Sequence, residues 1–199
     1  MADAPSLSLF TLFLATILTS NILLSNFLGT CSFIAISKDW TSSNGLGLAV
    51  TIVIGISAAI CWPILHWIVI PLGIDYLAFI IFIIVIAAIV QALEMIIDRV
   101  SPALYMALGI FLPLITVNCA VLGVVLFMQI RNYSFAQAVV FGFGSGAGWW
   151  LAIMLLAAIR KRVDKAPVPA GLQGTGITMI TIGFIAMAFL GFSGMIAVQ

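Results

Sequence analysis

The sequence predicts an all-α integral membrane protein that crosses the bilayer six times, as two inverted repeats of three helices, with helices 1 and 4 broken. Three observations lead to this fold class. Of the 199 residues, 64% are hydrophobic and 7% are charged, whereas about a quarter of the residues of a soluble domain are charged. Six apolar segments of membrane length follow one another. The first and fourth of them carry polar interruptions at matching places.

The six expected spans are separated by short polar connections. Crossing the hydrocarbon core takes about 20 apolar residues, and the segments that qualify are approximately Ser8–Ala35, Leu46–Ile70, Tyr76–Ile97, Ala103–Met128, Phe135–Ile159 and Thr175–Ala197. We therefore expect a single membrane domain over residues 1–199, divided into halves at about 1–100 and 101–199. The N-terminus lacks the basic region and cleavage site of a signal peptide, so we expect the first span to remain in the mature chain.

The basic residues predict which way the chain is oriented. Six of the seven follow the first, third and fifth spans, and only Arg131 lies in an even-numbered loop; the six are Lys38, Arg99, Arg160, Lys161, Arg162 and Lys165. By the positive-inside rule, the odd-numbered loops are cytoplasmic and both termini are periplasmic. A net charge of +1 without a basic block interleaved with aromatic residues argues against nucleic-acid binding.

Two similar stretches relate the halves. NILLSNFLGTC ends at Cys31 and GIFLPLITVNC ends at Cys119. Because each half has an odd number of spans, the second copy crosses the membrane in the opposite sense. Proline removes a helical hydrogen bond and Asn competes for backbone groups. We therefore predict discontinuous helices at Asn21, Asn26 and Gly29 in the first span, and at Pro113 and Asn118 in the fourth.

The cysteines allow two interpretations. A free cysteine can pack as a small hydrophobic residue, or its thiolate can bind an iron–sulfur cluster. Equivalent positions in an inverted repeat would bring Cys31 and Cys119 to one depth. Two thiolates leave a four-ligand cluster half complete, so the second pair would come from another chain. Cys61 has no counterpart in the second half, and we predict that it packs in a helix interface.

Other polar positions are weighed in the same way. Glu94 lies inside the third span, which makes it a functional candidate, with pairing to Arg99 or extension to the membrane surface as the alternative. His66, the only histidine, stands between Trp62 and Trp67 and is expected at the membrane interface rather than on a metal.

Two further features, one within the fifth span and one in the loop after it, have structural interpretations. The run GFGSGAGWW, residues 142–150, predicts a face of small residues for close helix packing. The basic run after it is interpreted as a topology determinant, with anionic lipid or a cytoplasmic partner as the alternative.

Several stretches resemble a known family. FLGTCSF, GIFLPLITVNCAVLG, VQALEMIIDR, RNYSFAQAVVFGFGSGAGWWLAI and GLQGTGITMITIGF are similar to the membrane subunits shared by the Na⁺-translocating NADH:quinone oxidoreductase and the Rnf electron-transfer complex. The resemblance extends from about Asn21 to Gly194. RNYSFAQAVVFGFGSGAGW and GITMIT are closer to the E subunit of the quinone reductase than to the A subunit of Rnf.

The resemblance implies an electron-transfer subunit, not catalytic alone, of a complex in the bacterial inner membrane that couples NADH oxidation and ubiquinone reduction to Na⁺ export. It implies a [2Fe–2S] cluster inside the membrane, with Cys31 and Cys119 as two ligands and the other two from a paralogous six-helix D subunit. NADH, flavins and quinone would be bound by other subunits. The residues expected around the cluster are Gly29, Thr30, Val117 and Asn118.

Three other functions remain open: an Rnf-type ferredoxin:NAD electron-transfer subunit, a secondary cation transporter with the same repeat, and a scaffold for redox subunits. A single carboxylate well inside the spans leaves little coupling chemistry for a transporter. If Na⁺ passes through this chain, Glu94, Thr116 and Asn118 are the expected contacts.

Overall fold

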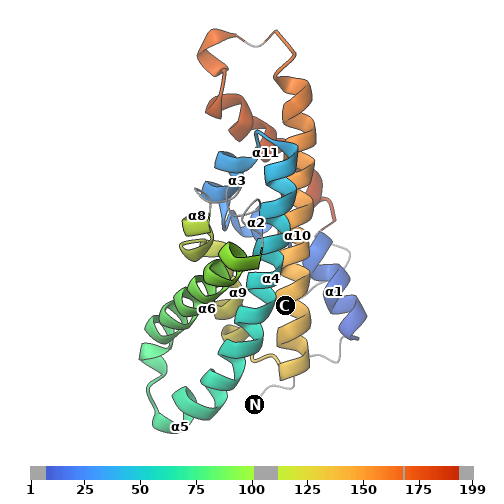
Figure 1. Ribbon diagram of the computed structural model, residues 1–199. Coiled ribbons are helices and arrows are strands. Elements are labelled where there is room, and N and C mark those ends of the chain that lie inside the picture. Colours follow the sequence, from blue (N-terminus) through green and yellow to red (C-terminus); the bar gives the residue numbers. More distant parts are fainter. Residues whose placement is uncertain (1–7, 101–111, 168, 193–199) are drawn as a thin grey trace.

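The computed structural model describes residues 8–100, 112–167 and 169–192, and the regular elements in these ranges are all helical. Two long helices form the centre, α4 (Trp40–Ile64) and α10 (Phe135–Val163), which run side by side in Figure 1. The shorter helix α1 (Leu9–Leu18) packs on α10. Helix α6 (Ala78–Val100) leans away from the centre and contacts α4.

Small residues let α4 and α10 approach closely. A Cβ atom added at Gly142 would lie 2.8 Å from the Cβ of Ala58, and one at Gly146 would lie 2.7 Å from the Cα of Thr51. This confirms the predicted small-residue face. Because the contacts run in opposite order along the two helices, α4 and α10 are antiparallel.

The first expected span is divided into short helices, as the polar interruptions predict. Helix α1 is followed by α2 (Ile22–Asn26) and α3 (Thr30–Ile36). Asn21 causes the first break: its side-chain oxygen accepts from the backbone N–H groups of Leu23 and Leu24, and its amide donates to the carbonyl oxygens of Ile17 and Gly148. A buried Asn that satisfies both of its polar atoms is a stable break in an apolar environment.

The fourth expected span is also interrupted. Two residues, Val117 and Asn118, separate helix α8 (Leu112–Thr116) from helix α9 (Cys119–Ile130). The expected start of this span, and the boundary between the two halves, lie outside the described residues.

Three helical stretches among the described residues are long and apolar enough to cross a membrane: Trp40–Leu72, Asp75–Ile96 and Phe135–Val163. The first continues α4 through a π-helical turn, Leu65–Val69, into α5 (Ile70–Leu72). Shorter apolar helices cover Leu9–Leu18, Leu114–Ile130 and Thr175–Leu190, the last being α11. The expected sixth span thus appears as a helix that ends at Leu190, and residues 193–199 are not described.

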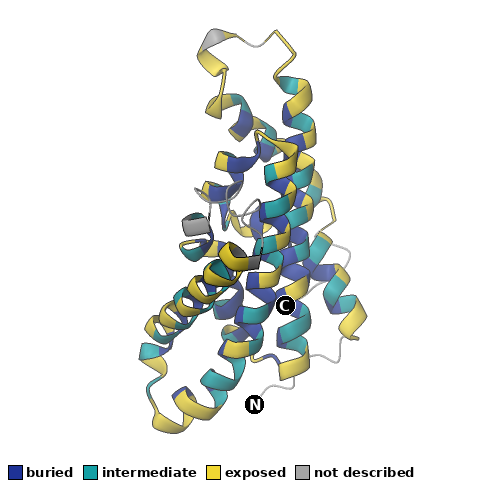
Figure 2. Cartoon of the chain, viewed as in Figure 1, coloured by how far each residue is buried: buried dark blue, intermediate teal, exposed yellow. Residues whose placement is uncertain are grey.

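The core lies between α4, α9 and α10, and Figure 2 shows buried residues concentrated there while the outer side of α6 is exposed. Some boundaries differ from the sequence-based expectation. The second span is expected to begin at Leu46, but α4 begins at Trp40. The sequence predicts that the fifth span ends at Ile159, with Arg160 in the following loop, but α10 continues to Val163 and Arg160 is buried. The hydrogen bonds of its guanidinium to the end of α3 explain this difference.

Candidate functional site

The site is built from the two breaks, one in each half of the chain. In the first, the chain takes a left-handed backbone conformation at Phe27 (φ 54°) and at Gly29 (φ 83°), and α3 then begins at Thr30. The conformation at Gly29 favours glycine, since other residues rarely adopt it. Because α3 begins at Thr30, Cys31 lies in the first turn of this helix, and its side chain is exposed.

In the second break, Asn118 starts α9. Its side-chain oxygen accepts a hydrogen bond from the backbone N–H of Ala120 at 3.0 Å, which is the standard contact of a helix N-cap. Cys119 is then the first residue of the helix, and its side chain is also exposed. Both cysteines thus occupy the first turn of a helix that follows a polar break.

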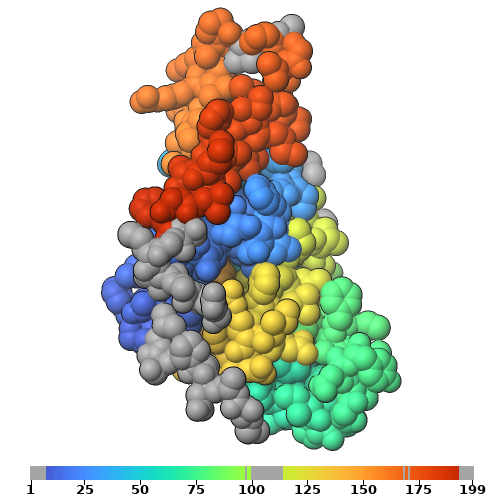
Figure 3. Space-filling view, turned by 180° about the vertical axis from the view of Figure 1, so that it is seen from behind, coloured from blue at the N-terminus to red at the C-terminus, as the bar shows by residue number. Residues whose placement is uncertain are grey.

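The two breaks are in direct contact. The backbone N–H of Gly29 donates a hydrogen bond to the Sγ of Cys119 at 2.9 Å. Helix α3 leads into α4 and α9 leads into α10, and because α4 and α10 are antiparallel, the starts of α3 and α9 face each other. From behind, the space-filling view in Figure 3 shows the blue segment of α3 bordering the yellow segment of α9.

Gly29 is closely surrounded on its other side. A Cβ atom at this position would lie 2.8 Å from the Oδ1 of Asn118 and 2.8 Å from the Nε1 of Trp149. Trp149 is fully buried, and its ring meets that of Phe33 edge to face at a centroid distance of 6.4 Å. Within the described part of the chain, the Nδ2 of Asn118 and the Nε1 of Trp149 have no hydrogen-bond partner. Sequence reasoning does not single out Trp149.

Arg160 is the second residue that sequence reasoning misses. The sequence pattern suggests a topology determinant, yet the guanidinium of Arg160 donates to the hydroxyl of Ser37 at 2.8 Å and to the carbonyl oxygen of Ile34 at 3.3 Å. These acceptors lie at the C-terminal end of α3, where carbonyl groups lack helical partners and a positive charge is favourable. A spacing of four, three and four residues from Trp149 through Ile153 and Leu156 to Arg160 marks this buried face in the sequence.

The donors at the two breaks are the exposed thiols of Cys31 and Cys119. All three cysteines are free, and the described residues contain no group of three or more His, Cys, Asp or Glu side chains that could hold a metal ion. Beside the thiols, Phe27 is 55% exposed and Val117 is 73% exposed. Two soft ligands on an apolar surface fit half of an iron–sulfur site and do not complete one.

Three other residues that the sequence predicts at or near the breaks remain to be placed. The hydroxyl of Thr30 donates to the carbonyl oxygen of Phe27 at 3.2 Å, a contact within the turn that leads into α3. Thr116 is the last residue of α8 and is half-buried, and the side chain of Pro113 lies outside the described ones.

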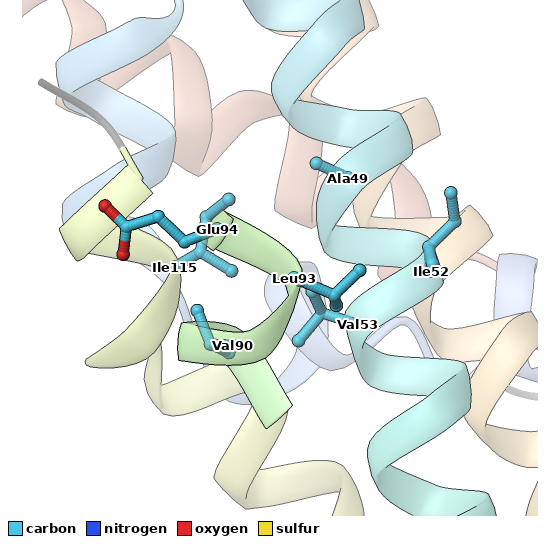
Figure 4. A pocket seen from close by; sticks show the side chains of 7 residues that line it. All are labelled: Ala49, Ile52, Val53, Val90, Leu93, Glu94 and Ile115. Carbon is cyan, nitrogen blue, oxygen red and sulfur yellow. The ribbon is translucent and has the colours of Figure 1, made fainter. Parts of the chain in front are cut away.

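Glu94 lines a separate small pocket of about 60 Å³ between α6, α4 and α8, shown in Figure 4. The other lining side chains are apolar: Ala49, Ile52, Val53, Val90, Leu93 and Ile115. The carboxylate of Glu94 points away from the α4 side chains, toward the segment of α8 that carries Ile115. No ion pair with Arg99 is found among the described side chains, so the structure gives no support for the alternative pairing.

Cys61 has the expected environment, and His66 lies against Trp62. Cys61 is fully buried in the hydrophobic core, which confirms its packing role. The imidazole of His66 stacks on Trp62 at a centroid distance of 4.0 Å, and Trp67 is 75% exposed beside it. Aromatic residues of this kind are typical of a membrane interface.

Comparisons with known proteins identify relatives along nearly the whole chain. Residues 9–196 match the family described as Rnf-Nqr subunit, membrane protein. The chain is 52% identical to the E subunit of the Na⁺-translocating NADH-quinone reductase of Photorhabdus laumondii and 53% identical to that of Yersinia enterocolitica, in each case over 92% of this chain and 96% of the relative. The corresponding protein of Chlamydia muridarum is 47% identical over 98% of this chain and 84% of the relative. The chain therefore belongs to the Rnf-Nqr family of membrane subunits.

Proposed function

We propose that this chain is the E subunit of a Na⁺-translocating NADH:quinone reductase, and that Cys31 and Cys119 supply two of the four thiolates that hold a [2Fe–2S] cluster inside the membrane. The contact between Gly29 and Cys119 is the observation that carries the proposal most strongly. It joins the two breaks, which supports a common surface for the two exposed thiols although 88 positions separate them in the sequence.

The other two thiolates would come from a paralogous six-helix D subunit. Two arguments support a second chain: the described residues offer only two soft ligands at this surface, and the apolar side chains of Phe27 and Val117 are exposed next to them. Exposed apolar side chains beside an incomplete site are what a subunit interface would cover.

When bound, an iron–sulfur cluster accepts and releases one electron at a time. The residues of this chain would hold and tune it. Cys31 and Cys119 bind iron through sulfur, and Asn118 fixes the start of the helix that carries Cys119. The N–H of Gly29 donates to the sulfur of Cys119, and hydrogen bonds to sulfur are one of the factors that set the potential of such clusters.

The arrangement in the membrane is part of the proposal. We infer six spans in two inverted repeats, in the bacterial inner membrane, with both termini in the periplasm. The antiparallel pair α4 and α10 and the opposed starts of α3 and α9 support this topology, because a two-fold axis in the membrane plane relates helices in this way. NADH, flavins and ubiquinone would be bound by other subunits of the complex. Na⁺ export would be coupled to their electron transfer, with Glu94 and Thr116 as candidate ion contacts in this chain.

The proposal is tested on the purified complex. In the variants Cys31→Ser and Cys119→Ser, we expect the complex to assemble but to lose the iron of the cluster and its electron paramagnetic resonance signal. We expect both variants to lose quinone reduction as well. Cys61→Ala is the matched control, because Cys61 is buried away from the exposed thiols. Unchanged iron content and an unchanged signal in either serine variant would rule the proposal out.

A further inference from the structure

A basic pocket lies at the C-terminal end of α10, where it meets the start of α4. Its volume is about 480 Å³, and it is lined by Trp40, Ala158, Lys161, Arg162 and Lys165. Three cations and an aromatic ring thus surround one space at the end of a helix long enough to span a membrane.

The three cations are available to a ligand. No ion pair involving Lys161, Arg162 or Lys165 is found in the described ranges, although Asp164 is their neighbour in the sequence and is exposed. Arg160 differs from them, because its guanidinium is buried and bonded to the end of α3. The C-terminal end of a helix favours positive charge, which could by itself account for the three cations. It does not account for the pocket between them or for the tryptophan ring that lines it.

An exposed apolar stripe leads along α10 to these cations. Leu151 is 41% exposed, Leu155 is 36% exposed, and Ala158 is exposed one turn further on. With Arg162 they follow a spacing of four, three and four residues, which keeps them on one side of the helix. A ligand held by the cations would therefore have an apolar surface directly beneath it.

We propose that this pocket binds the phosphate of an anionic phospholipid, with one acyl chain lying along Leu151 and Leu155. Positive charge attracts the phosphate, and Trp40, which is 51% exposed, is a residue type that prefers the boundary between headgroups and acyl chains. A soluble phosphate would need only the cations. An acidic protein segment would not need an apolar stripe that continues along a membrane-spanning helix. The combination of the two surfaces favours a lipid.

The test measures lipid retention by the purified complex in native mass spectrometry, with dioleoyl phosphatidylglycerol and dioleoyl phosphatidylcholine offered in equal amounts. We expect the anionic lipid to be preferred. Each of Lys161→Gln, Arg162→Gln and Lys165→Gln should weaken its retention about fivefold, and the triple variant on the order of a hundredfold. A charge-preserving triple variant, Lys161→Arg, Arg162→Lys and Lys165→Arg, should retain it.

The controls separate this pocket from charge in general. Lys38→Gln with Arg99→Gln removes two other cations and should leave retention unchanged. Neither 10 mM inorganic phosphate nor the headgroup alone, glycerophosphoglycerol, should displace the lipid.

Equal retention by the wild-type and triple-glutamine complexes would overturn the proposal. Displacement of the lipid by inorganic phosphate would also overturn it, because this result would indicate a soluble-anion site. Loss of another subunit from the triple variant with lipid still bound would indicate a protein contact instead. If the triple variant does not assemble, the three single variants decide the outcome.

Discussion

Gly29 is the residue on which the contact between the two breaks depends. Its left-handed backbone directs its N–H toward the sulfur of Cys119, and its missing side chain leaves room for Asn118 and Trp149. A non-glycine residue costs about 1 to 2 kcal/mol in this conformation, and here its Cβ would also displace two buried side chains. We predict that Gly29→Ala destabilises the protein by about 2 to 4 kcal/mol and alters the electron paramagnetic resonance signal of the complex.

Gly183→Ala is the matched control for this substitution. Gly183 lies in α11, and a Cβ atom there would meet no atom within 4 Å. Alanine is the better helix former by about 1 kcal/mol, so the control should be neutral or slightly stabilising. Thermal unfolding of the purified complex measures both effects. Equal midpoints for the two variants would show that the geometry at Gly29 is not required.

Two buried serines test the hydrogen-bonding pattern of the core. The hydroxyl of Ser43 donates to the carbonyl oxygen of Ile36 at 3.1 Å, whereas that of Ser145 has no partner in the described chain. We predict that Ser43→Ala lowers the free energy of unfolding by about 1 kcal/mol and that Ser145→Ala changes it by less than about half of that. Thermal midpoints of the two variants give the comparison. A loss for Ser145→Ala as large as that for Ser43→Ala would mean that its hydroxyl is bonded after all, for example to a buried water.

At the scale of elements, the short helix α3 is held at both ends by α10. Trp149 packs against Gly29 and Phe33 near its start. Near its end, the guanidinium of Arg160 donates to the carbonyl oxygen of Ile34 and to the hydroxyl of Ser37. A seven-residue helix has little stability of its own. Its position, and hence that of Cys31, therefore depends on these contacts.

We predict that Arg160→Gln loosens α3. Removing the guanidinium leaves buried acceptors without a charged donor, which costs about 1.5 to 3 kcal/mol and should speed amide exchange in residues 30–36 roughly 10- to 100-fold. Hydrogen–deuterium exchange of the purified complex measures this. Arg162→Gln, which removes an exposed cation two positions further on, should leave the exchange of α3 unchanged. Unchanged exchange in Arg160→Gln would refute the role assigned to Arg160.

The breaks could be predicted from the sequence because their causes are local. Asn21 and Asn118 cap the helices that follow them in the chain, and Gly29 supplies a turn that most residues avoid. The roles of Trp149 and Arg160 could not be predicted, because they depend on which helix packs against which face of α10. The periodicity of α10 reveals a buried face, but not that α3 lies on it. Consecutive charges from residue 160 onward resemble the start of a loop, although the helix continues to Val163.

At the scale of the whole molecule, the close packing of α4 and α10 fixes the direction of each helix relative to the other. Because they are antiparallel, the loops that precede them begin at opposite ends of the molecule. This arrangement brings the start of α3 against the start of α9. The alternation of spans and basic loops predicts the same relation from the sequence. The sequence pattern does not predict which side chains make the contact, because an inverted repeat predicts the direction of each helix but not the distances between side chains.

The orientation in the membrane gives the final prediction. Ala136 and Ala166 are exposed residues near the two ends of α10, whose 29 residues extend for about 44 Å, longer than the hydrocarbon core of about 30 Å. We predict that a charged maleimide added to intact spheroplasts labels Ala136→Cys and labels Ala166→Cys only after the membrane is opened. Wild-type protein controls for the native cysteines. If Ala166→Cys reacts first, the termini are cytoplasmic and the positive-inside argument fails. If both variants react from one side, α10 does not span the membrane and the inverted repeat fails with it.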